Sequence, residues 1–75
     1  MSLVDIQIGE KVLVKSMQAL DKLLKRRLVA FGLSEGSELR VKQKAMFKGP
    51  FTLECRGQFI SIRHCDAKMI KVELV

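Results

Sequence analysis

The stretch LDKLLKRRLVAFGLSEG, residues 20–36, decides the fold because it contains the one amphipathic helix that the sequence predicts. Apolar side chains recur in it at the i, i+3 and i+4 spacing that gathers them on one helical face. These side chains are Leu20, Leu23, Leu24, Leu28 and Phe31. Asp21 is placed to cap the first turn, and Gly32 is placed to end the helix with a left-handed residue. We therefore expect a helix that packs its apolar face on a core.

Short segments that alternate between apolar and polar residues flank this helix, which is the pattern of half-buried strands. They cover residues 11–15, 38–46, 51–55, 59–63 and 70–74, and a helical turn is expected at 64–68. In 38–46 the outer face should be basic: Arg40, Lys42 and Lys44. Because five short strands should not leave their edges open in so small a chain, we expect a mainly β fold with an inserted α-helix. It should be a small SH3-like barrel of about five antiparallel strands.

The chain carries a net charge of +6, and the whole excess lies in its middle. Between Lys22 and Arg56 there are nine Lys and Arg residues against three Glu residues, which gives +6. Such a basic region attracts acidic proteins, nucleic acids and anionic lipids without choosing among them. The 75 residues, of which 48% are hydrophobic, indicate one globular domain over residues 1–75. Since no apolar run reaches roughly 18 residues and no signal peptide is evident, we expect a cytoplasmic protein without membrane insertion.

Residues that could carry catalysis or hold a metal are few. The sequence contains no nucleophile elbow, P-loop or dinucleotide-binding glycine pattern, so we expect neither an enzyme nor a bound cofactor. Cys55, His64 and Cys65 are of the types that ligate zinc and similar metals. His64 and Cys65 are adjacent, however, which is poor ligand spacing, and Cys55 should point into the core. We therefore expect no metal site, with these three residues as the candidates if one exists.

Exposed apolar residues beside cations indicate a protein-binding surface. On the helix, the expected contact residues are Lys22, Lys25, Arg26, Leu28 and Val29, with Leu28 at the edge of the solvent-facing side. On a loop tip they are Met46, Phe47 and Lys48. The alternative for Met46 and Phe47 is that they fold back over one end of the barrel.

The basic strand face predicts a different partner, because Arg40, Lys42 and Lys44 could follow the phosphates of RNA. RNA-binding barrels usually expose aromatic rings for base stacking, whereas at least two of the four phenylalanines are expected in the core. A small RNA-binding barrel therefore stays the alternative function, and no stable nucleic acid complex is expected.

Several short pieces of the chain occur in an order and spacing that is typical of one known family. They are Leu3, Ile6 and Gly9 at the start; residues 24–33, LKRRLVAFGL, followed by Gly36; the turn Gly49-Pro50; residues 60–63, ISIR; Ala67; and residues 70–73, IKVE. With these pieces, nearly all of the chain resembles the ferrous iron transport protein A (FeoA) family.

The resemblance implies an SH3-like barrel with an inserted helix and a non-enzymatic accessory role in bacterial ferrous iron uptake. It implies that the partner is the ferrous iron permease of the inner membrane, contacted through its cytoplasmic GTP-binding region. The family has no catalytic motif to carry over and no metal-ligand pattern at Cys55, His64 or Cys65. A divergent member with another partner, and a homodimer through an exposed strand edge, stay open.

Overall fold

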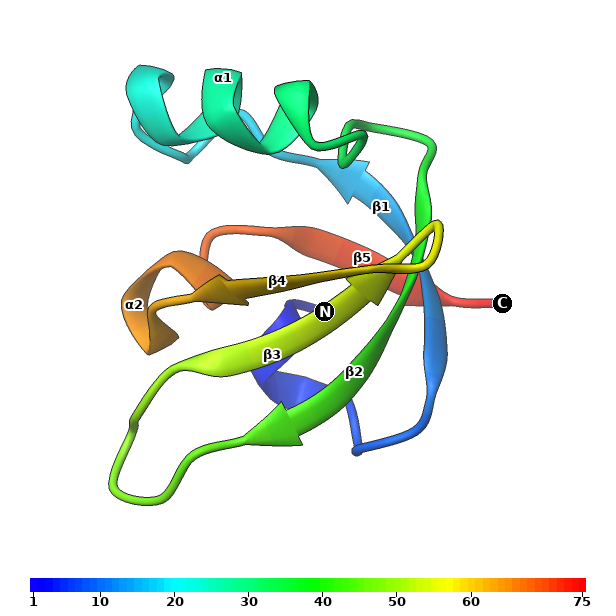
Figure 1. Ribbon diagram of the computed structural model, residues 1–75, viewed down its shortest axis with the longest axis vertical. Coiled ribbons are helices and arrows are strands. Elements are labelled where there is room, and N and C mark those ends of the chain that lie inside the picture. The colour runs from blue at the N-terminus through cyan, green and yellow to red at the C-terminus, as the bar shows by residue number, and fades with distance from the viewer.

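The computed structural model describes residues 1–75 and contains five strands, a nine-residue α-helix and two short helical turns (Figure 1). In chain order the elements are η1 (Leu3–Asp5), β1 (Lys11–Ser16), α1 (Lys22–Ala30), β2 (Glu38–Lys44), β3 (Phe51–Cys55), β4 (Gln58–Ile62), α2 (His64–Ala67) and β5 (Lys71–Leu74). Neighbouring strands all pair antiparallel in one sheet of order β4-β3-β2-β1-β5. The expected fold of five antiparallel strands, with a helix after the first, is confirmed.

Alternate residues of the strands form the core. β3 shows this most simply, because Phe51, Leu53 and Cys55 are buried and the residues between them are half-buried. Val12 and Val14 of β1 are buried in the same way. Eighteen buried hydrophobic residues form one cluster. Since burying a Val, Leu or Ile side chain contributes about 1.5–3 kcal/mol, this cluster is the main source of stability.

The two edges of the sheet differ in how they are covered. At the β5 edge, the backbone N–H of Val72 donates to the carbonyl oxygen of Met1 at 2.8 Å, and that of Leu3 donates to Ile70 at 3.3 Å. The N-terminal residues thus cover β5. β4 is the other end of the sheet, and no strand pairs with its outer side.

α1 begins and ends where the sequence predicts. The carboxylate of Asp21 accepts a hydrogen bond from the backbone N–H of Leu24, and the helix begins at Lys22. After Ala30 the chain turns through Gly32, whose φ of +92° suits a residue without a Cβ. No helix in this protein combines the length and the apolar character that crossing a membrane requires.

The buried side of α1 is narrower than the apolar stripe suggests. Leu28 is only 2% exposed and Leu24 is half-buried. Leu23 and Phe31, which were also expected to face the core, are 68% and 53% exposed, so the prediction was wrong for them. α1 lies at one end of the molecule (Figure 1), and Leu28 and Leu24 are its only residues that pack on the core cluster.

β2 departs from simple alternation at Lys42. Its pairing with β3 shifts there, so that Lys42 is the extra residue of a β-bulge. After the bulge Gln43 faces solvent, and Lys44 is half-buried with its Nζ 5.3 Å from the centre of the Phe51 ring. The expected basic outer face of this strand is therefore wrong at Lys44.

Candidate functional site

A groove of about 480 Å³ lies between α1 and β4, the free edge strand. Six of the eleven residues that line it are apolar: Leu23, Leu24, Leu28, Phe31, Ile60 and Ile62. Leu23 and Phe31 are both more than half exposed, so this groove presents apolar surface that no other part of the chain covers. Apolar surface of this kind on a small domain is typical of a site for another protein.

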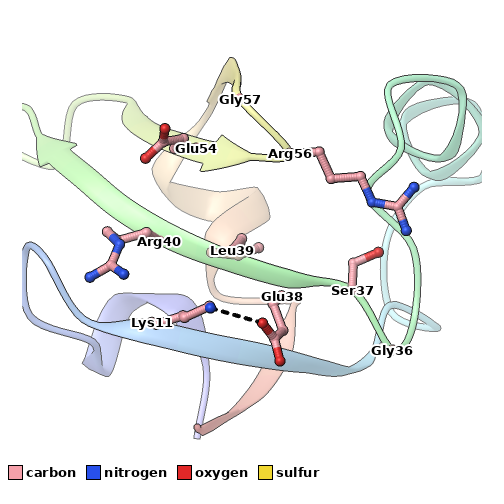
Figure 2. A pocket seen from close by; sticks show the side chains of 9 residues that line it. All are labelled: Lys11, Gly36, Ser37, Glu38, Leu39, Arg40, Glu54, Arg56 and Gly57. Carbon is pink, nitrogen blue, oxygen red and sulfur yellow. Dashed lines mark ion pairs between the residues drawn. The ribbon is translucent and has the colours of Figure 1, made fainter.

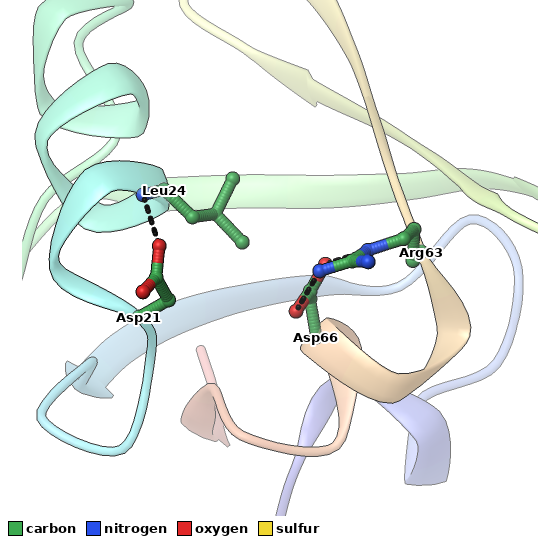
Figure 3. Close-up of polar contacts among 4 residues, drawn as sticks. All are labelled: Asp21, Leu24, Arg63 and Asp66. Atoms are coloured by element: carbon green, nitrogen blue, oxygen red, sulfur yellow. Dashed lines mark hydrogen bonds and ion pairs between the residues drawn. The ribbon is translucent and has the colours of Figure 1, made fainter.

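Polar contacts hold both walls of the groove in place (Figure 3). On the helix side, Asp21 Oδ2 accepts a hydrogen bond from the backbone N–H of Leu24 at 3.2 Å. Across the groove, Nε of Arg63 donates to Asp66 at 2.8 Å, and a second guanidinium nitrogen donates to the other carboxylate oxygen at 3.3 Å. The hydrogen bond to Asp66 raises the pKa of Arg63 above its ordinary value, so this side chain keeps its charge. These contacts fix the start of α1 on one wall and the position of the Arg63 side chain on the other.

The helix residues expected to contact a partner lie on the solvent side of α1, with one exception. Lys22, Arg26 and Val29 are exposed, and Lys25 is half-buried. Leu28 belongs to the buried core cluster and borders the groove, so it does not lie on the solvent-facing side as expected. It was placed at the edge of the exposed side, but it occupies the line along which α1 meets the core.

The loop between β2 and β3 carries the other expected contact residues. Met46 is 78% exposed and Phe47 is 94% exposed, and Lys48 is exposed beside them. These side chains therefore do not fold back over the barrel. The loop lies at the opposite end of the molecule from α1 (Figure 1). The two groups of expected contact residues are consequently two separate surfaces, which the structure does not bring together.

A polar hollow of about 500 Å³ lies along β1, β2 and the end of β3 (Figure 2). Its charged side chains have both signs, and Lys11 pairs with Glu38 at 3.0 Å. Arg40 points away from that pair and donates to the carbonyl oxygen of Gly9 at 2.6 Å. Only one of the nine lining residues is hydrophobic. Paired charges with little apolar surface indicate a solvated face rather than a ligand site.

The cations of the strand face considered for RNA already have partners within the domain. Arg40 and Lys44 each donate to a backbone carbonyl oxygen, at 2.6 and 3.2 Å. Nζ of Lys42 lies 3.7 Å from the carboxylate of Glu54. The three cations therefore do not form a free row along which a phosphate backbone could run.

More phenylalanine rings are exposed, in contrast, than the sequence predicted. Phe51 is the only buried phenylalanine, whereas Phe31, Phe47 and Phe59 are exposed. The expectation of at least two core phenylalanines was therefore wrong. The exposed rings come from the end of α1, the β2–β3 loop and β4, so they belong to different parts of the surface.

The structure does not bring Cys55, His64 and Cys65 together. Cys55 is buried at the end of β3, where its Sγ donates to the carbonyl oxygen of Glu38 at 3.5 Å. His64 packs edge-on against Phe51 at the beginning of that strand, with 5.6 Å between the ring centres. Burial raises the pKa of the Cys55 thiol, which keeps it protonated. No three Cys, His, Asp or Glu side chains are placed to share one metal ion.

Sequence reasoning missed the groove because it assigned Leu23 and Phe31 to the core. Both lie within the apolar stripe, and periodicity alone cannot separate a buried position from an exposed one in that stripe. Leu23 lies in the first turn of α1 and Phe31 follows its last residue, and helix ends are where such a stripe most easily leaves the core. An exposed strand edge was considered, but the sequence did not indicate that β4 would be that edge or that it would lie beside α1.

Comparisons with known proteins agree with this fold. A family model described as FeoA domain matches residues 1–74. The solution structure of the FeoA protein from Chlorobium tepidum is similar with a TM-score of 0.93 at 29% identity, covering 100% of this chain and 70% of that one. A FeoA-like protein from Clostridium acetobutylicum is similar with a TM-score of 0.81 at 29% identity, covering 100% of this chain and 86% of that one.

The same domain shape occurs inside a larger protein. The manganese regulator SloR is similar with a TM-score of 0.80 at 25% identity, and this chain covers 34% of its length. No curated protein sequence matches the chain significantly. The match of the family model over residues 1–74 nevertheless shows that this chain belongs to the FeoA domain family, which is associated with ferrous iron transport.

Proposed function

We propose that this protein is an accessory protein of bacterial ferrous iron uptake that binds the cytoplasmic GTP-binding region of the ferrous iron permease. Membership of the FeoA family supports the transport process. The uncovered apolar groove between α1 and β4 supports a protein partner and is the observation that carries the proposal. In this role the protein acts in the cytoplasm by binding alone, without catalysis and without a metal or cofactor of its own.

The groove has the composition expected of a binding site's centre and rim. Leu23 and Phe31 supply exposed apolar anchors, and Arg27 lines the groove beside them. Lys22 and Arg26 extend the positive charge over the solvent side of α1. Apolar anchors supply most of the binding free energy at an interface, while charges at the rim steer the partner. The complementary patch on the permease should therefore be apolar at its centre and acidic around it.

β4 offers a second means of attachment. As the free edge of the sheet, it has outward N–H and C=O groups available to an added strand. An extended segment of the partner could pair with β4 and place its side chains in the groove. A homodimer through β4 would use the same edge, so dimerisation and permease binding should compete.

The test is a calorimetric titration of the full chain into the purified cytoplasmic domain of the permease. Leu23→Ser and Arg26→Glu should each weaken binding while the thermal unfolding midpoint stays near that of the parent. Lys71→Glu is the matched control, because this exposed lysine lies on β5, outside the groove. No heat of binding at low salt, with both proteins folded, would refute the proposal.

The exposed phenylalanines favour one alternative, a small RNA-binding barrel. Phe59 on β4 and Phe31 at the end of α1 could stack on unpaired bases. Binding of a single-stranded RNA whose affinity falls steeply with salt would support this function, because phosphate contacts release counterions. A flat signal at low salt, in a titration where the permease domain binds, would exclude it.

A further inference from the structure

A hollow of about 560 Å³ lies between the β2–β3 loop and the start of α2. The loop is at the end of the molecule opposite α1 (Figure 1). Its lining residues are Lys48, Gly49, Pro50, Arg63, His64, Cys65 and Lys68. No carboxylate lines it, whereas each of the other two hollows described above is lined by two. Arg63 is already paired with Asp66, so Lys48 and Lys68 supply the unpaired positive charge. The hollow is therefore suited to an anion.

The neighbouring loop tip is apolar and held outward. Hydrogen bonds from Ala45 N–H to the Pro50 carbonyl at 3.0 Å, and from Gly49 N–H to the Met46 carbonyl at 3.1 Å, close the loop. Gly49 packs so tightly that a Cβ there would lie 2.7 Å from the Cβ of Ala45. Phe47 adopts a φ of +57° and is 94% exposed. The tight loop therefore holds its apolar side chains out in water.

We propose that this end of the domain docks on the surface of an anionic phospholipid bilayer. In this arrangement Phe47 and Met46 enter the interfacial region, while Lys48 and Lys68 bind lipid phosphates at the hollow. The observation behind this choice is the combination of a projecting apolar tip with an adjacent hollow whose charged lining is cationic throughout. Such a combination matches a bilayer, which offers anionic headgroups above an apolar layer.

The shape of the tip favours a bilayer over a folded protein. A rigid partner would need a cavity to receive a side chain that stands out from a loop, whereas lipid headgroups move apart around it. Two apolar side chains and two free cations make a weak contact, with an association constant below the roughly 10⁴ M⁻¹ of a single acyl chain. A contact of that strength would orient a protein already held on a membrane protein by its other end. That role rests on the proposed function, but the hollow shares only Arg63 with the groove, and vesicle binding tests it without the permease.

The chain contains neither Trp nor Tyr, so one introduced tryptophan reports on its own surroundings. Phe47→Trp should show a blue-shifted emission on addition of vesicles of phosphatidylcholine and phosphatidylglycerol, and a much smaller shift with phosphatidylcholine alone. Phe59→Trp is the matched control, because Phe59 is exposed on β4 rather than at the loop tip. Its emission should not change.

Charge reversal provides the second readout. Lys48→Glu combined with Lys68→Glu, in the Phe47→Trp background, should abolish the shift, as should high salt. Lys71→Glu combined with Lys15→Glu should retain most of it, since neither residue lines the hollow. An unchanged Phe47→Trp spectrum with anionic vesicles at low salt, or equal shifts at positions 47 and 59, overturns the proposal. A spectrum that responds to the permease domain but not to vesicles overturns it too, and identifies the tip as a protein contact.

Discussion

The carboxylate of Asp21 lies 3.2 Å from the backbone nitrogen of Leu24, and this hydrogen bond determines where α1 begins (Figure 3). Because the first N–H groups of a helix have no partner within it, an acidic cap stabilises them. Asp21→Ala should lower the stability by about 1 kcal/mol, which corresponds to roughly 4–8 °C in the unfolding midpoint of a domain this size. Thermal unfolding followed by circular dichroism measures the change. Asp21→Asn retains a capping oxygen and should remain close to the parent; equal losses for both variants would contradict this role.

Leu28 and Leu23 have the same side chain on the same helix, but truncation should lower the stability of the domain only at Leu28. Leu28 is 2% exposed in the core cluster, and Leu23 is 68% exposed at the groove. Leu28→Ala should cost about 2–5 kcal/mol, because it removes buried methyl groups and leaves a cavity. Leu23→Ala should change stability by less than about 0.5 kcal/mol. Urea denaturation of the two variants decides the point, and similar midpoints would mean that α1 packs differently.

The features of this structure that could be predicted are those determined by residues close together in the sequence. Asp21 and Gly32 mark the ends of α1 through short-range chemistry, and the alternation of Leu53 and Cys55 follows from the pleat of β3. The orientation of Lys44, by contrast, depends on a bulge that arises from pairing with another strand. Nothing in the residues around Lys42 indicates that bulge.

The same distinction holds for the candidate site. The cations of α1 could be placed from helical periodicity, since Lys22 and Arg26 are exposed as predicted. The groove could not, because it depends on the distance between α1 and the edge strand β4, which are separated by more than 25 residues of chain. The hollow beside Lys48 likewise joins a loop to the start of α2. Surfaces that join distant segments appear only when the fold is known.

The Cys55 thiol should make stability depend on pH in the alkaline range. Burial raises its pKa, so the unfolded chain releases the proton at a lower pH than the native protein does. The stabilisation is complete below the ordinary thiol pKa of about 8.5 and is lost as pH rises through the raised value. Urea midpoints between about pH 8 and 10 should therefore fall less steeply for Cys55→Ala than for the parent. Cys65→Ala removes an exposed thiol, so its urea midpoint should fall with pH as steeply as that of the parent. An equally steep fall in Cys55→Ala would show that the Cys55 thiol is not the cause.

Phe47 should be a residue whose replacement stabilises the domain while impairing its contact with a membrane. Its φ of +57° lies in the left-handed region, which is unfavourable for a bulky side chain and tolerated by Asn. Phe47→Asn should therefore raise stability by about 1 kcal/mol, since the ring makes little contact with the rest of the chain. Phe59→Asn is the matched control: Phe59 lies in β4, where Asn is a poor strand residue, so this change should lower stability. Urea denaturation gives both values, and vesicle sedimentation of Phe47→Asn should show weaker binding despite the more stable fold. A destabilised Phe47→Asn would mean that the ring packs on the domain in solution, which would remove the exposed tip on which membrane docking depends.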